Sequence, residues 1–180
     1  MAKVDSAAVQ DGFDLYLHGF IVADDGQWTI VQQGMNDGRR QARRYHWLSE
    51  GLTSFVDDPH SAIEGHGQGT IVNLADRRAE RSHTAQLDFL QALGPDGIAA
   101  ELARLSPQDA RGPSEPLLPH LIMPERHDVR AEDIVPRRLH AALAAAADRE
   151  PQDFPDLLLT SGIGARSVQA LAMVAEVAHG

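Results

Sequence analysis

The sequence predicts an α+β protein, in which a small antiparallel sheet built on a β-hairpin is flanked by helices and followed by a helical C-terminal module. Residues 14–23 and 27–33 are rich in apolar and β-branched side chains, which is typical of strands. Between them lies Asp24-Asp25-Gly26-Gln27, whose Asp-Gly step favours a tight hairpin turn. Later segments instead carry apolar residues at helical spacing.

The other elements follow in chain order. Residues 2–11 are predicted as a short opening helix. After the breaker at 36–38, the run RRQARRYHWLSEGLTSF predicts a helix over 38–53, and the Gly/His/Asp-rich run at 57–69 predicts a loop. A short strand is expected over 70–74, and helices over 76–93 and 95–105, with Asn73 or Asp76 as the cap of the first.

The domain organisation is predicted from a change of composition. Residues 106–130 are proline-rich and poorly periodic, as expected of a connector between domains. The sequence therefore predicts an α+β domain over 1–105 and a helical module over 131–180, with helices at about 131–147, 152–160 and 165–178.

Charge and composition exclude several kinds of chemistry. The chain of 180 residues has a net charge of −10, no cysteine, fifteen arginines and a single lysine, Lys3. A Gly-Lys-Ser/Thr phosphate loop, a thiol nucleophile and a zinc ribbon are therefore excluded. With neither an apolar run of membrane-spanning length nor a signal-like start, we expect a cytoplasmic protein with no membrane contact.

The clearest local motif is LLLTSGIGARSVQALAMV, which resembles the helix-hairpin-helix family. Gly162 and Gly164 permit a tight turn and a close approach by a ligand, and the next helix begins with free N–H groups. With Arg166 and Ser167 they are candidate contacts to a DNA phosphate, which would be independent of base sequence. The alternative is a packing corner without a ligand.

A second candidate for nucleic-acid binding is RRQARRYHW. On the predicted helix, arginine side chains would lie beside aromatic rings, a combination that binds phosphates and stacks on bases. The candidate residues are Arg39, Arg40, Arg43, Arg44, Tyr45 and His46. The alternative is that Tyr45 and Trp47 belong to the core and the arginines pair with carboxylates.

Catalytic candidates surround the predicted hairpin. Acidic residues before the first strand and a polar pair on the second resemble the restriction-type PD-(D/E)XK nuclease core, although the lysine of that core is missing. The candidates are Asp11, Asp14, His18, Gln32 and Gln33. A Mg²⁺ or Mn²⁺ ion is expected to bind through Asp14 and His60, whose oxygen and nitrogen atoms suit such metals.

Several long strings resemble a known family. AKVDSAAVQDGFDLY, WTIVQQGMN, ARRYHWLSE, DDPHSAI and LLLTSGIGARSVQALAMVAEV are similar to the family catalogued as domain of unknown function 763. The resemblance implies a cytoplasmic family whose members are longer, so N-terminal and C-terminal parts are expected to be missing here. Family members are expected to have adjacent histidines at 17 and 18, but this chain has Leu17 before His18.

These observations predict a DNA-binding protein that contacts the phosphate backbone without sequence preference. A role in DNA repair or processing follows, with a metal-dependent nuclease as the enzymatic extension. The alternative is a non-catalytic protein-interaction module.

Overall fold

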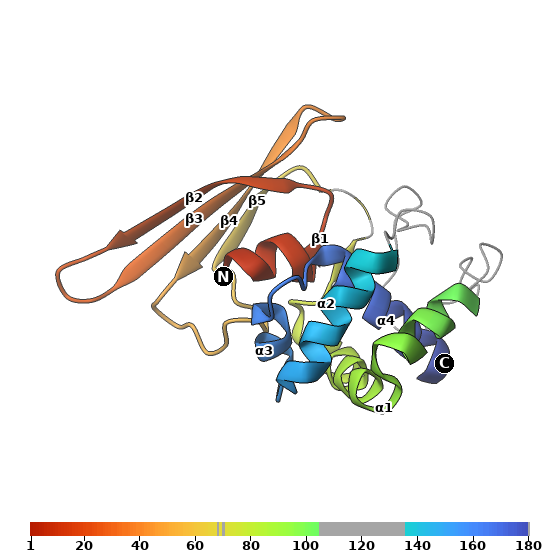
Figure 1. Cartoon of the computed structure of the whole chain (residues 1–180). Coiled ribbons are helices and arrows are strands. Elements are labelled where there is room, and N and C mark those ends of the chain that lie inside the picture. The colour runs from red at the N-terminus through yellow and green to blue at the C-terminus, as the bar shows by residue number, and fades with distance from the viewer. Residues whose placement is uncertain (68, 70, 105–135, 180) are drawn as a thin grey trace.

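The computed structural model describes residues 1–67, 69, 71–104 and 136–179, and it confirms the predicted α+β class. A four-stranded antiparallel sheet, in the order β2-β3-β4-β5, extends to one side of a group of packed helices (Figure 1). A second, two-stranded sheet pairs β1 with β6. The proline-rich connector predicted at 106–130 lies outside the described residues.

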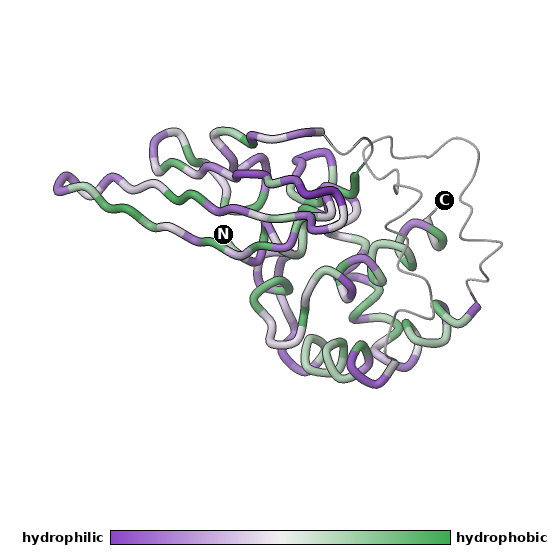
Figure 2. Tube along the Cα trace, turned by 90° about the horizontal axis from the view of Figure 1, so that it is seen from above, coloured by the Kyte–Doolittle hydropathy of each residue, from purple (hydrophilic) through white to green (hydrophobic). Residues whose placement is uncertain are grey.

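The predicted hairpin is confirmed. Strands β2 (Asp14–Val22) and β3 (Trp28–Asn36) pair antiparallel, with Val22 opposite Trp28 next to the turn. Gly26 adopts a φ of 85°, which favours glycine, and its amide donates to the carbonyl of Ala23 at 3.0 Å. Figure 2 shows the hairpin as a long arm with hydrophobic stretches extending away from the helices.

The helix predicted over 38–53 is wrong, because this segment forms strand β4 (Gln41–Leu48). The turn after β3 contains Arg40 at a φ of 52°, and β4 then pairs with β3 from Asn36↔Gln41 to Thr29↔Leu48. Burial alternates along β4, so that every second side chain points into the core. Tertiary pairing with β3 therefore outweighs the helix propensity of the arginine-rich run.

The loop predicted over 57–69 also contains a strand, β5 (Ala62–Gly65), which pairs with β4. At the N-terminus, the predicted helix over 2–11 is shorter. It consists of η1 (Val4–Ala8), a turn of π-helix, followed directly by β1 (Val9–Gln10). The strand predicted over 70–74 is present in its centre as β6 (Val72–Asn73), which pairs with β1.

The helices predicted over 76–93 and 95–105 correspond to η2 (Arg77–Ala79) and α1 (Glu80–Arg104). Gly94, with a φ of 61°, and the following Pro95 mark the kink between the two halves of α1. Asp76 caps η2 by accepting from the amide of Arg78. The C-terminal part forms α2 (Pro136–Arg149), α3 (Phe154–Leu159) and α4 (Ala165–His179).

One hydrophobic cluster joins these elements. Helices α2 and α4 both pack against α1, and η1 contacts α4 (Figure 1). The cluster's largest fully buried side chains include Trp47, Tyr45, Ile30, Leu90, Ile98, Leu143, Leu157, Ile163 and Leu171. The domain boundary between 105 and 131 stays a prediction. Within the described ranges, no helix has the length and apolar character needed to cross a membrane.

Candidate functional site

A buried carboxylate, Asp5, connects η1 to the sheet. Its side chain is 0% exposed. One oxygen accepts from Gln32 Nε2 at 2.5 Å and from Trp47 Nε1 at 2.9 Å, and the other lies 2.5 Å from His60 Nε2. Three donors from three separate segments therefore compensate the loss of hydration that burial imposes on this charge. Asp5 was not among the sequence-predicted residues, because nothing in AKVDSAAV marks one acidic residue as buried.

A second buried carboxylate, Asp11, lies beyond β1 in the same N-terminal segment. Its Oδ2 accepts from Arg43 Nη1 at 2.8 Å and from the Tyr45 hydroxyl at 2.7 Å. Its Oδ1 accepts from the amide of Phe13 at 3.3 Å. Burial, together with the nearby Asp11 carboxylate, raises the pKa of Tyr45 far above its usual range, so the phenol remains a donor. Arg43 also donates through Nη2 to the carbonyl of His66.

The structure joins no two of the catalytic candidates by a side-chain hydrogen bond among the described residues. Asp11 and Gln32 are buried and bonded as above, whereas Asp14 and His18 lie exposed on β2. His18 is paired with Gln32 in the register of β2 and β3, and Gln33 belongs to the opposite face of β3. Among the residues that the structure describes, no group of three or more His, Cys, Asp or Glu side chains could hold a metal ion. His60 contacts Asp5, and the predicted pairing of His60 with Asp14 therefore finds no support.

The arginine-rich run also differs from its predicted arrangement, because a strand separates its side chains onto two faces. Arg43 and Tyr45 point inward and are buried, so the Tyr45 ring is not available to stack on a base. Arg44 and Arg40 are exposed, and His46 lies 3.6 Å from Glu64. Arg39, on the turn, has an interaction partner of its own. The continuous cationic helix face expected from the sequence is therefore absent from the described structure.

The Gly162–Ser167 corner does have the predicted geometry of a turn followed by a helix start. Gly162 adopts a φ of 87°, the amide of Ile163 donates to the carbonyl of Thr160, and Ile163 is buried. A cavity of about 310 Å³ opens at the start of α4. It is lined by Arg138, Leu139, Gly162, Gly164, Ala165, Arg166 and Ser167. Arg138 comes from α2, so sequence proximity could not have assigned it to this corner.

The charges around this cavity favour an anion. None of the described residues lining it is acidic. Asp156 in α3 is paired with Arg149 at 2.7 Å, and Asp153 accepts from the amide of Asp156 as the cap of α3. Arg138 and Arg166 are exposed, and neither has an acidic partner within the described part of the chain.

The N-terminal segment holds the corner from the other side. The Lys3 ammonium donates to the carbonyl of Ile163, and Gln10 Nε2 donates to the carbonyl of Ala165 at 3.0 Å. The sequence interpretation assigns Lys3, the single lysine, to no candidate site. In the structure Lys3 contacts the Gly-Ile-Gly turn. Asp5 and Asp11 fix this same segment to the sheet, so it links the sheet to the corner.

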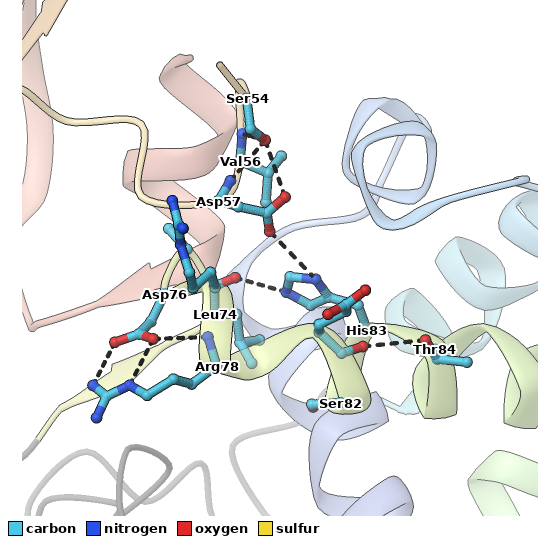
Figure 3. Close-up of polar contacts among 12 residues, drawn as sticks. Ser54, Val56, Asp57, Leu74, Asp76, Arg78, Ser82, His83 and Thr84 are labelled. Atoms are coloured by element: carbon cyan, nitrogen blue, oxygen red, sulfur yellow. Dashed lines mark hydrogen bonds and ion pairs between the residues drawn. The ribbon is translucent and has the colours of Figure 1, made fainter. Parts of the chain in front are cut away.

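A larger cavity, of about 710 Å³, surrounds the start of α1 and the start of α3. His83, with 10% of its side chain exposed, lies in its wall and stacks on Phe154, with ring centroids 3.9 Å apart and planes 5° apart. Figure 3 shows the imidazole between two oxygen atoms. Its Nε2 lies 2.7 Å from the carbonyl of Leu74, and its Nδ1 lies 4.0 Å from Oδ1 of Asp57.

Asp57 is itself positioned by Ser54. The Ser54 hydroxyl donates to Oδ2 of Asp57 at 3.0 Å, while it accepts from the amides of Val56 and Asp57 (Figure 3). Burial lowers the pKa of His83, so its neutral form predominates at neutral pH. The sequence does not identify His83 as a candidate site residue, because no motif in this helical segment distinguishes it from an ordinary core histidine.

Comparison with known proteins identifies the family of the chain. A family model described as protein of unknown function (DUF763) matches residues 1–180, the whole chain. The chain matches no curated protein and no solved structure.

Proposed function

Since the chain belongs to the DUF763 family, whose function is unknown, we propose from its geometry that the Gly162–Ser167 corner binds the phosphate backbone of DNA. The observation that carries the proposal is the cavity at the start of α4, where Arg138 and Arg166 from two helices flank the same space. The first amides of α4 have no partners within the helix, and they present the positive end of its dipole to this cavity.

The rest of the corner suits the same ligand. Arginine guanidinium groups match phosphate oxygens with paired donors, and Ser167 is also among the residues that line the cavity. Backbone amides and arginines that contact phosphates read no bases, so the proposed binding has low sequence specificity. The resemblance of this corner to the helix-hairpin-helix family supports the proposal.

The exposed Arg40 and Arg44 come much earlier in the chain, on the turn and strand of the sheet. Arg40 and Arg44 are candidates for additional phosphate contacts only with a duplex long enough to reach both the sheet and the Gly162–Ser167 corner. The nuclease extension and the interaction-module alternative stay predictions, and no contact among the described residues favours either over DNA binding.

The first test measures how binding of a duplex depends on salt. For each phosphate that the protein no longer neutralises, the slope of log Kobs against log salt becomes shallower by about 1. Arg138→Ala and Arg166→Ala are each expected to flatten the slope by about that amount and to weaken binding of all duplex sequences alike. Fluorescence anisotropy with two duplexes of unrelated sequence measures both quantities.

The matched control for these variants is Arg104→Ala. Arg104 is also an exposed helical arginine, but it pairs with Glu101 at the end of α1, outside the cavity. Its removal changes the net charge equally and is expected to leave the slope unchanged. Equal effects of all three substitutions, or binding that does not respond to salt, would contradict phosphate binding at the corner.

A second test uses the two glycines of the corner. A Cβ at Gly164 would meet no atom within 4 Å, so the Gly164→Ala variant is expected to fold normally. It places a methyl group at the cavity wall, where it weakens DNA binding several-fold.

The other glycine, Gly162, tests stability instead. A Cβ at Gly162 would lie 3.3 Å from Cβ of Ala142, and the φ of 87° disfavours any side chain. Gly162→Ala should therefore lower the free energy of unfolding by about 1–2 kcal/mol.

Thermal unfolding and anisotropy distinguish these two effects. A Gly164→Ala variant with unchanged stability and unchanged DNA affinity would show that the corner serves packing alone.

A further inference from the structure

The larger cavity has no part in the proposed DNA binding. The ligand that suits it depends on which ring nitrogen of His83 carries the hydrogen. A backbone carbonyl can only accept a hydrogen bond, so the contact with Leu74 requires that Nε2 of His83 carries the hydrogen. In the neutral imidazole, Nδ1 is then an acceptor. Stacking on Phe154 fixes the ring plane, so Nδ1 stays directed toward Asp57.

Two acceptors therefore face each other without a donor between them. Nδ1 of His83 and Oδ1 of Asp57 are 4.0 Å apart, which is too far for a direct hydrogen bond. Ser54 donates to the other oxygen of Asp57, which leaves Oδ1 with no hydrogen-bond donor among the described residues. His83 and Asp57 both line the cavity, and neither of these two acceptors has a donor among the described residues, so the gap favours an incoming group with at least two N–H donors.

The lining of the cavity decides the charge of that group. Four carboxylates line it, from Asp57, Glu80, Asp88 and Asp153, against one cation, Arg77. Arg77 is already paired with Asp58 at 2.7 Å. The cavity therefore repels phosphates and other anions and attracts cations, in contrast to the corner at α4.

We propose that this cavity binds a small organic cation through an ammonium or guanidinium group that donates to both His83 Nδ1 and Asp57 Oδ1. An organic cation fits better than a metal ion, since no three imidazole and carboxylate groups come together among the described residues. The cavity of about 710 Å³ has room for a ligand well beyond the charged group itself. The remaining carboxylates along the cavity suit a second cationic group, as in a diamine.

The test uses agmatine, which carries a guanidinium and an ammonium group, as the probe on the whole chain. Titration followed by NMR of the imidazole nitrogens is expected to show saturable shifts of His83. Asp57→Asn should weaken binding at least about tenfold. Because 44% of the Asp57 side chain is exposed, this variant is expected to fold, which its melting temperature verifies.

Asp25→Asn is the matched control, since it removes the same charge in the exposed β2–β3 turn, outside the cavity. It is expected to bind agmatine like the unsubstituted protein, whereas glutarate, a dianion of similar length, should produce no saturable shift of His83. Three results would each overturn the proposal: no saturation at millimolar agmatine, equal weakening by the two asparagine variants, or binding of glutarate in place of agmatine. In the first case a water molecule between His83 and Asp57 would account for the gap.

Discussion

Replacing Asp5 by alanine is expected to lower the free energy of unfolding by about 3–5 kcal/mol. The carboxylate is fully buried and accepts from Gln32 and Trp47 while it contacts the ring of His60. Alanine leaves all three of these groups buried without the acceptor, and each orphaned group costs about 1–3 kcal/mol. Since domains are typically stable by about 5–15 kcal/mol, urea denaturation should show a large shift of the midpoint.

Asp5→Asn gives a graded version of the same experiment if the alanine variant does not fold. The asparagine can keep its carbonyl oxygen toward Gln32 and Trp47, whereas its amide NH2 group replaces the oxygen that faces His60. An intermediate loss is expected, together with a shift of the Trp47 indole N–H signal in NMR spectra. Asp24→Ala, an exposed carboxylate in the hairpin turn, should change stability by no more than about 0.5 kcal/mol. Similar losses at Asp5 and Asp24 would contradict the role assigned to Asp5.

The part of the fold that the sequence predicts best is the part decided by local signals. The Asp-Gly turn and its flanking apolar runs determine the hairpin whatever the rest of the chain does, and Gly94-Pro95 interrupts α1 where two helices were expected. Helices α3 and α4 begin and end close to their predicted limits because Asp153 caps α3 and the Gly162–Gly164 turn separates α3 from α4.

Strand β4 shows what local signals cannot decide. Arginines at 43 and 44 satisfy both a helical and an alternating pattern, and only the presence of β3 alongside selects the strand. The helix prediction puts Arg43 on the surface and therefore counts it as a candidate DNA contact. In the structure Arg43 is buried and paired with Asp11.

The candidate sites depend on contacts between residues far apart in sequence, which no local pattern reveals. Arg138 reaches the corner across the α2–α4 interface, Lys3 reaches Ile163 from the other end of the chain, and His83 meets Asp57 only after the chain has passed through β5 and β6. The glycine turn itself was recognisable, since a close approach to backbone amides requires a particular residue type at a particular spacing.

The second large effect is expected at the buried ion pair of Asp11 and Arg43, and it calls for a double-mutant cycle. Each partner is nearly excluded from solvent, and Tyr45 donates to the same carboxylate oxygen. Asp11→Leu leaves a guanidinium buried without its counter-charge, and Arg43→Met leaves a carboxylate in the same situation. Either substitution alone is expected to lower the free energy of unfolding by about 3–5 kcal/mol.

The double variant, Asp11→Leu with Arg43→Met, removes both charges and fills much of the same volume with apolar atoms. It should recover most of the stability, because a hydrophobic replacement of a buried ion pair is often neutral or stabilising. The double variant does not restore the acceptor of the Tyr45 hydroxyl or of the Phe13 amide, and each lost acceptor costs about 1–3 kcal/mol. Tyr45→Phe in the same background removes the part of this penalty that is due to the hydroxyl. Urea denaturation of the variants gives the coupling energy directly. If the effects at Asp11 and Arg43 simply add, the two residues act independently, and the ion pair is not what holds the N-terminal segment against β4.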